Sequence, residues 1–125
     1  MPGIASRMTE GEAPAGVLAP GDVIWVQPEI AVGREQGGRR PALVVAGAGY
    51  LQTVDTLALV VPITTADQGW PNHIEVLGTE LEQRSWAMSE QIRTISRERV
   101  VARAGHANDA TLAAVRRWLA DFLDL

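Results

Sequence analysis

The chain has 125 residues, no Cys and two His, and its 15 acidic against 11 basic residues give a formal net charge of −4. This length suits one domain, because two separate cores in so short a chain would each be marginal. The lack of Cys excludes a disulfide framework and a cysteine nucleophile, and two His without an HExxH pattern argue against a histidine-based metal site. We therefore expect no metal and no cofactor, and the acidic balance argues mildly against a nucleic-acid partner.

Residues 1–19 are expected to form a flexible leader. They contain Gly, Ala, Pro and Glu with little periodicity, and they lack the charged-then-apolar order of a signal peptide. The longest apolar runs elsewhere have the length of a strand, which is too short for a membrane span. We therefore expect one domain over residues 20–125, located in the cytoplasm and without a membrane partner.

The first half of this domain has the pattern of three strands and one polar loop. Residues 22–27 form a β-rich run, and residues 28–38 hold three Gly among charged residues, which predicts a flexible loop. The apolar runs 42–46 and 57–63 predict central strands that are buried on both faces. Pro62 has no N–H for the ladder, so the third strand should meet an edge or a bulge there.

The second half of the domain begins with further strands. Residues 73–77 alternate as a fourth strand, and residues 86–95 as a longer fifth strand. A single helical turn is expected over residues 96–100, before residues 101–104 close the sheet. The fifth strand is predicted to turn three large apolar side chains inward, namely Trp86, Met88 and Ile92.

The C-terminal segment has a helical period instead. Its apolar residues recur at the spacing of one helical face, with Asn108 as the predicted N-cap and Arg116 and Arg117 on the polar side. The residues of the apolar face are Leu112, Val115, Leu119 and Phe122. Five or six short strands followed by one amphipathic helix predict a mainly β fold, a small twisted barrel with the helix packed against it.

The most concentrated polar feature is the loop over residues 33–41. Arg34, Arg39 and Arg40 against Glu35 give it a net charge of +2 in a negative chain. Its Gly residues allow the backbone to approach a ligand closely, and the forked Arg side chain suits bidentate phosphate contacts. The alternative, which composition alone favours, is an ordinary solvated hairpin loop.

Other polar candidates lie at the ends of the predicted strands. Thr64 and Thr65 end the third strand with two hydroxyls, which either bind a ligand or reflect β-propensity and local backbone bonding. Gln91 and Arg93 are expected on the same face of the fifth strand, and that face is either a binding surface or a polar exterior. His73 is isolated and typical of a packing or surface residue.

A second basic segment follows the fifth strand. Its four Arg residues and one Glu carry a net charge of +3 over residues 93–103. Charge is therefore unevenly placed, and a negative body with a small positive groove can still hold a few phosphates. All eleven cations are Arg, the residue best suited to forked phosphate contacts.

Four motifs occur in a recognisable order. They are Gly21-Asp-Val-Ile-Trp-Val26, Glu35-Gln-Gly-Gly-Arg-Arg-Pro-Ala-Leu-Val-Val45, Val60-Val-Pro-Ile-Thr64 and Glu90-Gln-Ile-Arg-Thr-Ile95. Each motif is weak alone, but their order and spacing, followed by a closing helix, resemble the MazF/PemK family of toxin endoribonucleases. The resemblance runs from about residue 20 to the end of the chain.

The resemblance implies an SH3-like barrel of the CcdB/PemK type, assembled as a homodimer. It also implies metal-independent cleavage of single-stranded RNA at short motifs in messenger RNA, and neutralisation by a MazE-type antitoxin. The Arg of the Arg-Pro pair and the Thr of the Pro-Ile-Thr motif are the family residues most closely tied to catalysis, and they match Arg40 and Thr64. Glu35 is the candidate for proton transfer. The remaining candidates for RNA contacts are Arg34, Gln36, Arg39, Thr65, His73, Gln91 and Arg93.

The mechanism expected from this resemblance is attack of the RNA 2′-hydroxyl on the adjacent phosphate. It would leave a 2′,3′-cyclic phosphate and a 5′-hydroxyl, with Arg40 stabilising the charge that develops on the phosphorane. Two alternatives remain open at this point. One is a CcdB-like toxin that inhibits DNA gyrase, and the other is a non-catalytic barrel that binds RNA or protein.

Overall fold

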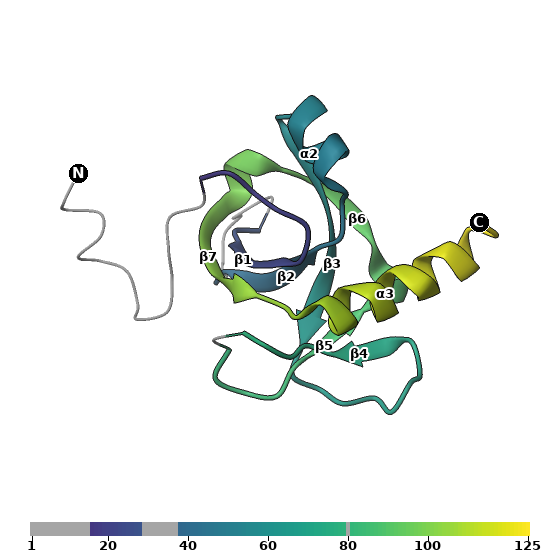
Figure 1. The fold of residues 1–125 in the computed structure, drawn as a ribbon. Coiled ribbons are helices and arrows are strands. Elements are labelled where there is room, and N and C mark those ends of the chain that lie inside the picture. The colour runs from purple at the N-terminus through teal and green to yellow at the C-terminus, as the bar shows by residue number, and fades with distance from the viewer. Residues whose placement is uncertain (1–15, 29–37, 80) are drawn as a thin grey trace.

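The computed structural model describes residues 16–28, 38–79 and 81–125 (Figure 1). Over these residues the chain is mainly β with a C-terminal helix, as the sequence predicts. In chain order the elements are β1 (Asp22–Val26), β2 (Arg40–Val44), α2 (Ala48–Thr53), β3 (Leu57–Thr64), β4 (His73–Glu75), β5 (Trp86–Met88), the 3₁₀ turn η1 (Ser89–Gln91), β6 (Arg93–Ser96), the 3₁₀ turn η2 (Arg97–Arg99), β7 (Val100–His106) and α3 (Asp109–Phe122).

The strands form one antiparallel sheet in the order β4-β5-β3-β2-β1-β7, and β6 also pairs with β3. The pairing of β1 with β7 shifts register twice, after Val23 and after Trp25. Such irregularities bend strands and increase their twist. The sheet accordingly curls into a small barrel, with α2 and the β4–β5 hairpin at opposite ends (Figure 1).

Alternate residues of the central strands feed two hydrophobic cores, which confirms that β2 and β3 are buried on both faces. The first, the helix core, joins one face of the sheet to α3 and includes Val23, Leu43, Val61, Val115 and Leu119. The second, the barrel core, lies on the other face and includes Ile24, Val44, Leu51, Val60 and Ile95.

The predicted long fifth strand is wrong as a single element. Residues 86–95 divide into β5, η1 and the start of β6, and β5 pairs with Ile63 and Thr64 whereas β6 pairs with the other end of β3. Gln91 therefore lies in a 3₁₀ turn and Arg93 in β6, instead of on one face of one strand. Ile92, predicted to turn inward, is 40% exposed because it lies at this junction.

Pro62 explains where the interruption falls. It pairs with Ala42 on β2, while the opposite edge of β3 changes partner from β6 to β5 between Val60 and Ile63. Proline has no N–H to offer to a neighbouring strand, so it is tolerated where a ladder is interrupted. The sequence expectation of an edge or bulge at this position agrees with the change of partner.

The C-terminal helix begins where the sequence predicts. The side chain of Asn108 accepts a hydrogen bond of 2.9 Å from the backbone N–H of Thr111, so Asn108 is the N-cap. Val115 and Leu119 are buried on the predicted face, but Phe122 is 45% exposed at the end of the helix. The short helix α2 was not expected from the sequence.

The residues just before β1 are packed against the barrel. Leu18 belongs to the barrel core, and the backbone N–H of Ala19 donates to Asp22 Oδ2 at 2.8 Å. Residues 1–15 lie outside the described residues, so the leader over residues 1–19 stays a prediction. Within the described ranges, no helix is both long and apolar enough to cross a membrane.

Candidate active site

A pocket of about 230 Å³ opens at one end of the barrel core. It lies at the N-terminal end of β2, whereas the C-terminal end of that strand leads towards α2. Its lining combines three Arg with three Pro, namely Arg40, Arg93, Arg99, Pro28, Pro41 and Pro62. The pocket therefore offers a positively charged edge over an apolar surface.

The sheet register explains why these residues meet. Val26 pairs with Arg40 between β1 and β2, and Val60 pairs with Arg93 between β3 and β6. Residues directly opposite each other on neighbouring strands project from the same face of a sheet. Arg40 and Arg93 come from segments far apart in the sequence, and the register brings both onto the face that carries the barrel core.

Thr64 ends β3 on the same face. The pairing of β2 with β3 reaches Ala42 opposite Pro62, and Thr64, two residues beyond Pro62, shares its face and pairs with Trp86 of β5. The Thr64 hydroxyl oxygen accepts a hydrogen bond of 3.0 Å from the backbone N–H of Ala66. Because that bond uses the hydroxyl as an acceptor, the Thr64 O–H proton remains available for donation to a ligand. Thr65 follows and is exposed.

The three Arg residues that line the pocket differ in their hydrogen-bond partners. Arg40 is exposed, and no side chain within the described part of the chain pairs with its guanidinium. Arg93 Nη2 donates to Gln91 Oε1 at 3.4 Å. Arg99, which the sequence did not single out as a site residue, donates from Nε to the carbonyl of Gln27 at 2.8 Å. A count of charge could place Arg99 in a basic segment but not beside Arg40.

The second basic segment is not one surface. Arg97 donates to the carbonyls of Leu51, Val54 and Leu57, and Arg103 lies 3.8 Å from the buried carboxylate of Asp22. Only Arg93 and Arg99 of this segment line the pocket. The second basic segment therefore contributes two of its four cations to the pocket.

The polar loop is covered in part by the structure. Arg34, Glu35 and Gln36 lie outside the described residues, so their roles stay predictions. Arg39 is described, and its guanidinium carbon lies 4.7 Å from the centroid of the Trp25 ring. Trp25 packs against the helix core, so this contact lies on the other face of the sheet from the pocket.

His73 is placed away from solvent. Its side chain is only 2% exposed, and Nε2 lies 3.0 and 3.1 Å from the two carboxylate oxygens of Glu90. Partial burial acts to raise the pKa of Glu90, but hydrogen bonds from His73, its own backbone and Gln91 outweigh burial and leave the pKa below its ordinary value. Glu90 was not predicted as a site residue, and the structure shows that its carboxylate accepts a hydrogen bond from the predicted residue Gln91.

Metal ligands are not grouped in the described residues. No set of three or more His, Cys, Asp or Glu side chains within residues 16–28, 38–79 and 81–125 is arranged to hold a metal ion. The polar side chains that line the pocket are the guanidinium groups of three Arg and the amide of Gln27, groups that can bind phosphate oxygens.

Known proteins share both the sequence pattern and the fold. The Escherichia coli K12 endoribonuclease toxin MazF is 34% identical over 76 residues, which make up 61% of this chain and 66% of MazF, just under two thirds of its length. The Bacillus subtilis endoribonuclease EndoA is 32% identical over 104 residues, which cover 79% of this chain and 88% of EndoA.

A solved structure has a similar fold. The MazE–MazF crystal structure (Form-II) from Deinococcus radiodurans superimposes with a TM-score of 0.74 at 28% identity, covering 87% of this chain and 97% of that chain. The predicted SH3-like barrel of the CcdB/PemK type with a C-terminal helix is thereby confirmed. A family model described as PemK-like, MazF-like toxin of type II toxin-antitoxin system matches residues 19–123, and the chain belongs to this family.

Proposed function

We propose that this protein is an endoribonuclease toxin that cleaves single-stranded RNA at a short sequence motif. The proposal rests chiefly on one observation: Arg40 and Arg93 line one pocket, and Thr64 ends the neighbouring strand on the same face. Membership of the toxin family supports it, as do two similar proteins named as endoribonucleases. The lining suits a short stretch of RNA, because guanidinium groups bind phosphates and apolar surface accommodates bases.

The proposed reaction uses the RNA itself as the nucleophile. The 2′-hydroxyl attacks the adjacent phosphorus, the bond to the 5′-oxygen breaks, and the products carry a 2′,3′-cyclic phosphate and a 5′-hydroxyl. No water and no metal ion takes part in this displacement. Arg40 stabilises the negative charge on the phosphorane, and Thr64 donates its hydroxyl proton in a hydrogen bond to a phosphate oxygen.

Proton transfer needs a group other than Arg40. A guanidinium stays protonated in proteins, so Arg40 acts through charge and hydrogen bonds. Within this proposal Glu35 removes the proton from the 2′-hydroxyl, and that proton or one from solvent is delivered to the departing 5′-oxygen. Gln36, Gln91 and Arg93 contact the flanking nucleotides.

The decisive experiment incubates the purified protein with a long single-stranded RNA in excess EDTA. The expected products accept phosphate at their 5′ ends from polynucleotide kinase without prior dephosphorylation, and their 3′ ends resist extension until the cyclic phosphate is opened and the resulting monophosphate is removed. Sequencing the 5′-hydroxyl ends gives the motif. An Arg40→Ala preparation, purified in parallel, controls for contaminating ribonucleases.

Assays of the purified wild-type protein also distinguish the two alternative functions. Intact RNA together with inhibition of DNA gyrase supercoiling would identify a CcdB-like gyrase inhibitor. RNA that is bound without new ends would identify a non-catalytic binding barrel. Either result overturns the proposed nuclease activity.

The proposal includes a homodimer and a MazE-type antitoxin in the cytoplasm. Support for an interface comes from the C-terminal end of α3, where Phe122 and Leu123 are 45% and 62% exposed. The Deinococcus radiodurans relative was solved as a MazE–MazF complex, which supports a partner of that kind. Light scattering at micromolar concentration tests the dimer, and co-purification with a co-expressed MazE-type protein that suppresses cleavage tests the antitoxin.

A further inference from the structure

The carboxylate of Glu90, the middle residue of η1, accepts hydrogen bonds from three side chains. Asn72 Nδ2 donates to Oε1 at 2.7 Å, His73 Nε2 lies 3.0 Å from Oε2, and Gln91 Nε2 donates to Oε2 at 3.3 Å. A carboxylate that accepts several such bonds is held in one place, because each donor restricts its rotation. Glu90 is therefore fixed from β4 and the segment before it, while its side chain remains 31% exposed.

His73 acts as a fixed donor in this arrangement. Its Nδ1 is buried without a hydrogen-bond partner among the described residues, and its ring packs against Trp70 at a centroid distance of 4.8 Å. Because a carboxylate can only accept, Nε2 carries the proton that is donated to Glu90. The sequence reasoning proposed His73 as an RNA contact, whereas this placement assigns it to holding Glu90.

The amide of Gln91 lies between two groups of opposite hydrogen-bonding character. Its Nε2 donates to the Glu90 carboxylate at 3.3 Å, and its Oε1 accepts from Arg93 Nη2 at 3.4 Å. A carboxylate can only accept and a guanidinium can only donate. If the amide were flipped, Oε1 would lie against the carboxylate, acceptor against acceptor, and Nε2 would lie against the guanidinium, donor against donor. Only one orientation of the amide therefore satisfies both neighbours.

We propose that Glu90 is a positioning residue that sets the base preference of the nuclease by fixing the orientation of the Gln91 amide. A fixed amide presents its donor and acceptor in one order, so it pairs with a nucleobase edge of the complementary order and disfavours the reverse. The preferred ligand is thus one nucleotide of the RNA motif, read next to the phosphate held by Arg93. This inference rests on the proposed ribonuclease function.

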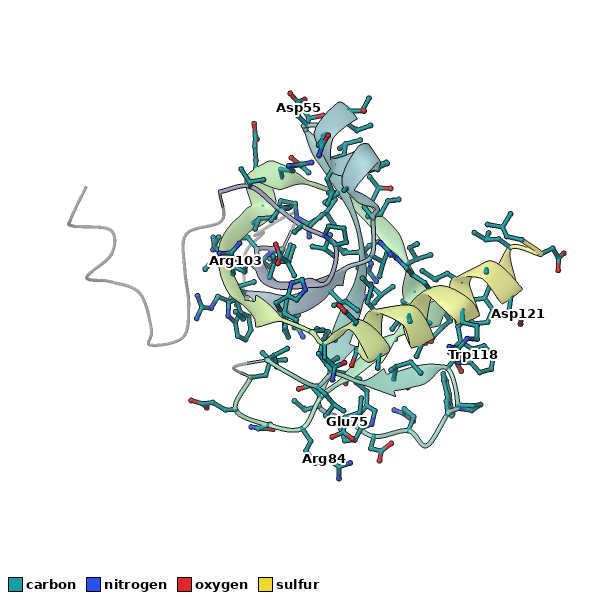
Figure 2. All side chains as sticks on the ribbon, viewed as in Figure 1. Asp55, Glu75, Arg84, Arg103, Trp118 and Asp121 are labelled. Carbon is teal, nitrogen blue, oxygen red and sulfur yellow. The ribbon has the colours of Figure 1, made fainter. Side chains whose placement is uncertain are left out.

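The matched variants are Glu90→Gln and Glu75→Gln. Glu90→Gln keeps the size of the side chain but can donate as well as accept, so the Gln91 amide is free to flip. Glu75 lies on the same β4–β5 hairpin, and its carboxylate accepts two hydrogen bonds from Arg84, at 2.8 and 3.0 Å. Figure 2 shows this pair at the outer side of the hairpin. Glu75→Gln therefore removes a comparable carboxylate without altering the partners of Gln91.

The measured quantity is the ratio of kcat/KM for the preferred RNA to kcat/KM for RNAs with one base of the motif changed. Glu90→Gln is expected to lower this ratio about tenfold at one motif position, since an amide reading a base edge discriminates by roughly that factor or more. Glu75→Gln is expected to keep the wild-type ratio. In a Gln91→Ala background, Glu90→Gln should cause no further loss, because the amide that it positions is gone.

Each outcome decides the inference. A folded Glu90→Gln protein that keeps the wild-type ratio at every motif position overturns the inference. The inference is also overturned if Glu90→Gln lowers the ratio as much in the Gln91→Ala background as it does in the wild-type background. If Glu90→Gln fails to fold, Glu90→Asp carries the same test, because it keeps the charge but withdraws it from Gln91. If the wild-type protein leaves RNA uncut, the proposed function and this inference both fail. If the wild-type protein cuts RNA but Glu90→Gln keeps its base preference, only this inference fails.

Discussion

The Arg residues of the pocket differ from two Arg residues elsewhere in the fold, one at the end of α2 and one on α3. Arg40 and Arg93 are exposed and line the pocket. Arg97 and Arg116 are partly buried and bind main-chain carbonyls, those of Leu51, Val54 and Leu57 in one case and those of Val45 and Ala46 in the other. The same residue type thus serves ligand binding in one region and stability in the other.

The difference follows from the hydrogen-bond acceptors that lie near each guanidinium. The carbonyls of Leu51 and Val54 lie at the C-terminal end of α2, where a helix leaves carbonyls without internal partners. Arg97 satisfies them and places a positive charge at the negative end of the helix. Among residues 16–28, 38–79 and 81–125, no carbonyl accepts a hydrogen bond from the guanidinium of Arg40, so within this part of the chain its donors remain available to phosphate oxygens.

The largest expected effect comes from Arg40→Ala. We expect the cleavage rate to fall about 10²- to 10³-fold, because a positioned donor that stabilises the transition-state charge is lost. Stability should change by no more than about 0.5 kcal/mol, since the side chain is exposed. Single-turnover cleavage and urea denaturation measure the two quantities. A folded variant that cuts at the wild-type rate contradicts the role of Arg40.

The opposite pattern is expected for Arg97→Ala. Removing this side chain leaves carbonyls near α2 without their donor, which should lower the free energy of unfolding by about 1–3 kcal/mol. Arg117, exposed on α3, provides the control, and Arg117→Ala should stay within about 0.5 kcal/mol of wild type. Urea denaturation of the three proteins measures the difference. Equal stability of the two variants would contradict the structural role of Arg97.

Arg99 tests how many cations act at the pocket. If Arg40, Arg93 and Arg99 each neutralise one RNA phosphate, the logarithm of the binding constant should fall against the logarithm of salt concentration with a slope of about −2. Arg99→Gln should make that slope shallower by about 0.7, whereas Arg117→Gln should leave it unchanged. Fluorescence anisotropy of a non-cleavable RNA at several salt concentrations measures it. An unchanged slope for Arg99→Gln would remove Arg99 from the binding site.

The smallest effect concerns pH and Glu90. The pKa of Glu90 is lower in the folded state than its ordinary value of about 4.3, so its ionised form stabilises the fold. This contribution is complete above the unfolded pKa and is lost as pH falls through the folded pKa. The stability difference between wild type and Glu90→Gln should therefore shrink below about pH 4.3. Urea denaturation from pH 3 to 7 checks this, and a difference independent of pH would contradict it.

Local sequence signals accounted for most of the fold. Alternation and apolar runs identified the strands that became β1, β2 and β3, and the capping residue and helical period identified α3 from Asn108 onwards. The division of residues 86–95 was not predicted, because Trp86, Met88 and Ile92 keep the spacing of one strand face and a single polar residue at that spacing, Glu90, does not by itself end a strand. It arises because β5 and β6 pair with different parts of β3, on either side of Pro62.

The candidate site was predicted only in part, again because tertiary pairing cannot be read from the local sequence. The motifs named Arg40, Thr64 and Arg93, but nothing local separates those residues from Arg97 or Arg116. The carbonyl partners of Arg97 lie 40 to 46 residues earlier in the chain, and those of Arg116 lie 70 and 71 residues earlier. Such partners depend on the tertiary fold, so a count of charge overestimates the cations that face a ligand.

The central claim is that RNA held at this pocket is cut by its own 2′-hydroxyl. Once the motif is mapped, single-turnover cleavage is compared between that RNA and one with a single 2′-deoxynucleotide on the 5′ side of the cut. The two RNAs should bind with similar affinity, and cleavage at the substituted position should fall below detection. Cleavage there at a rate close to that of the unmodified RNA would contradict the account.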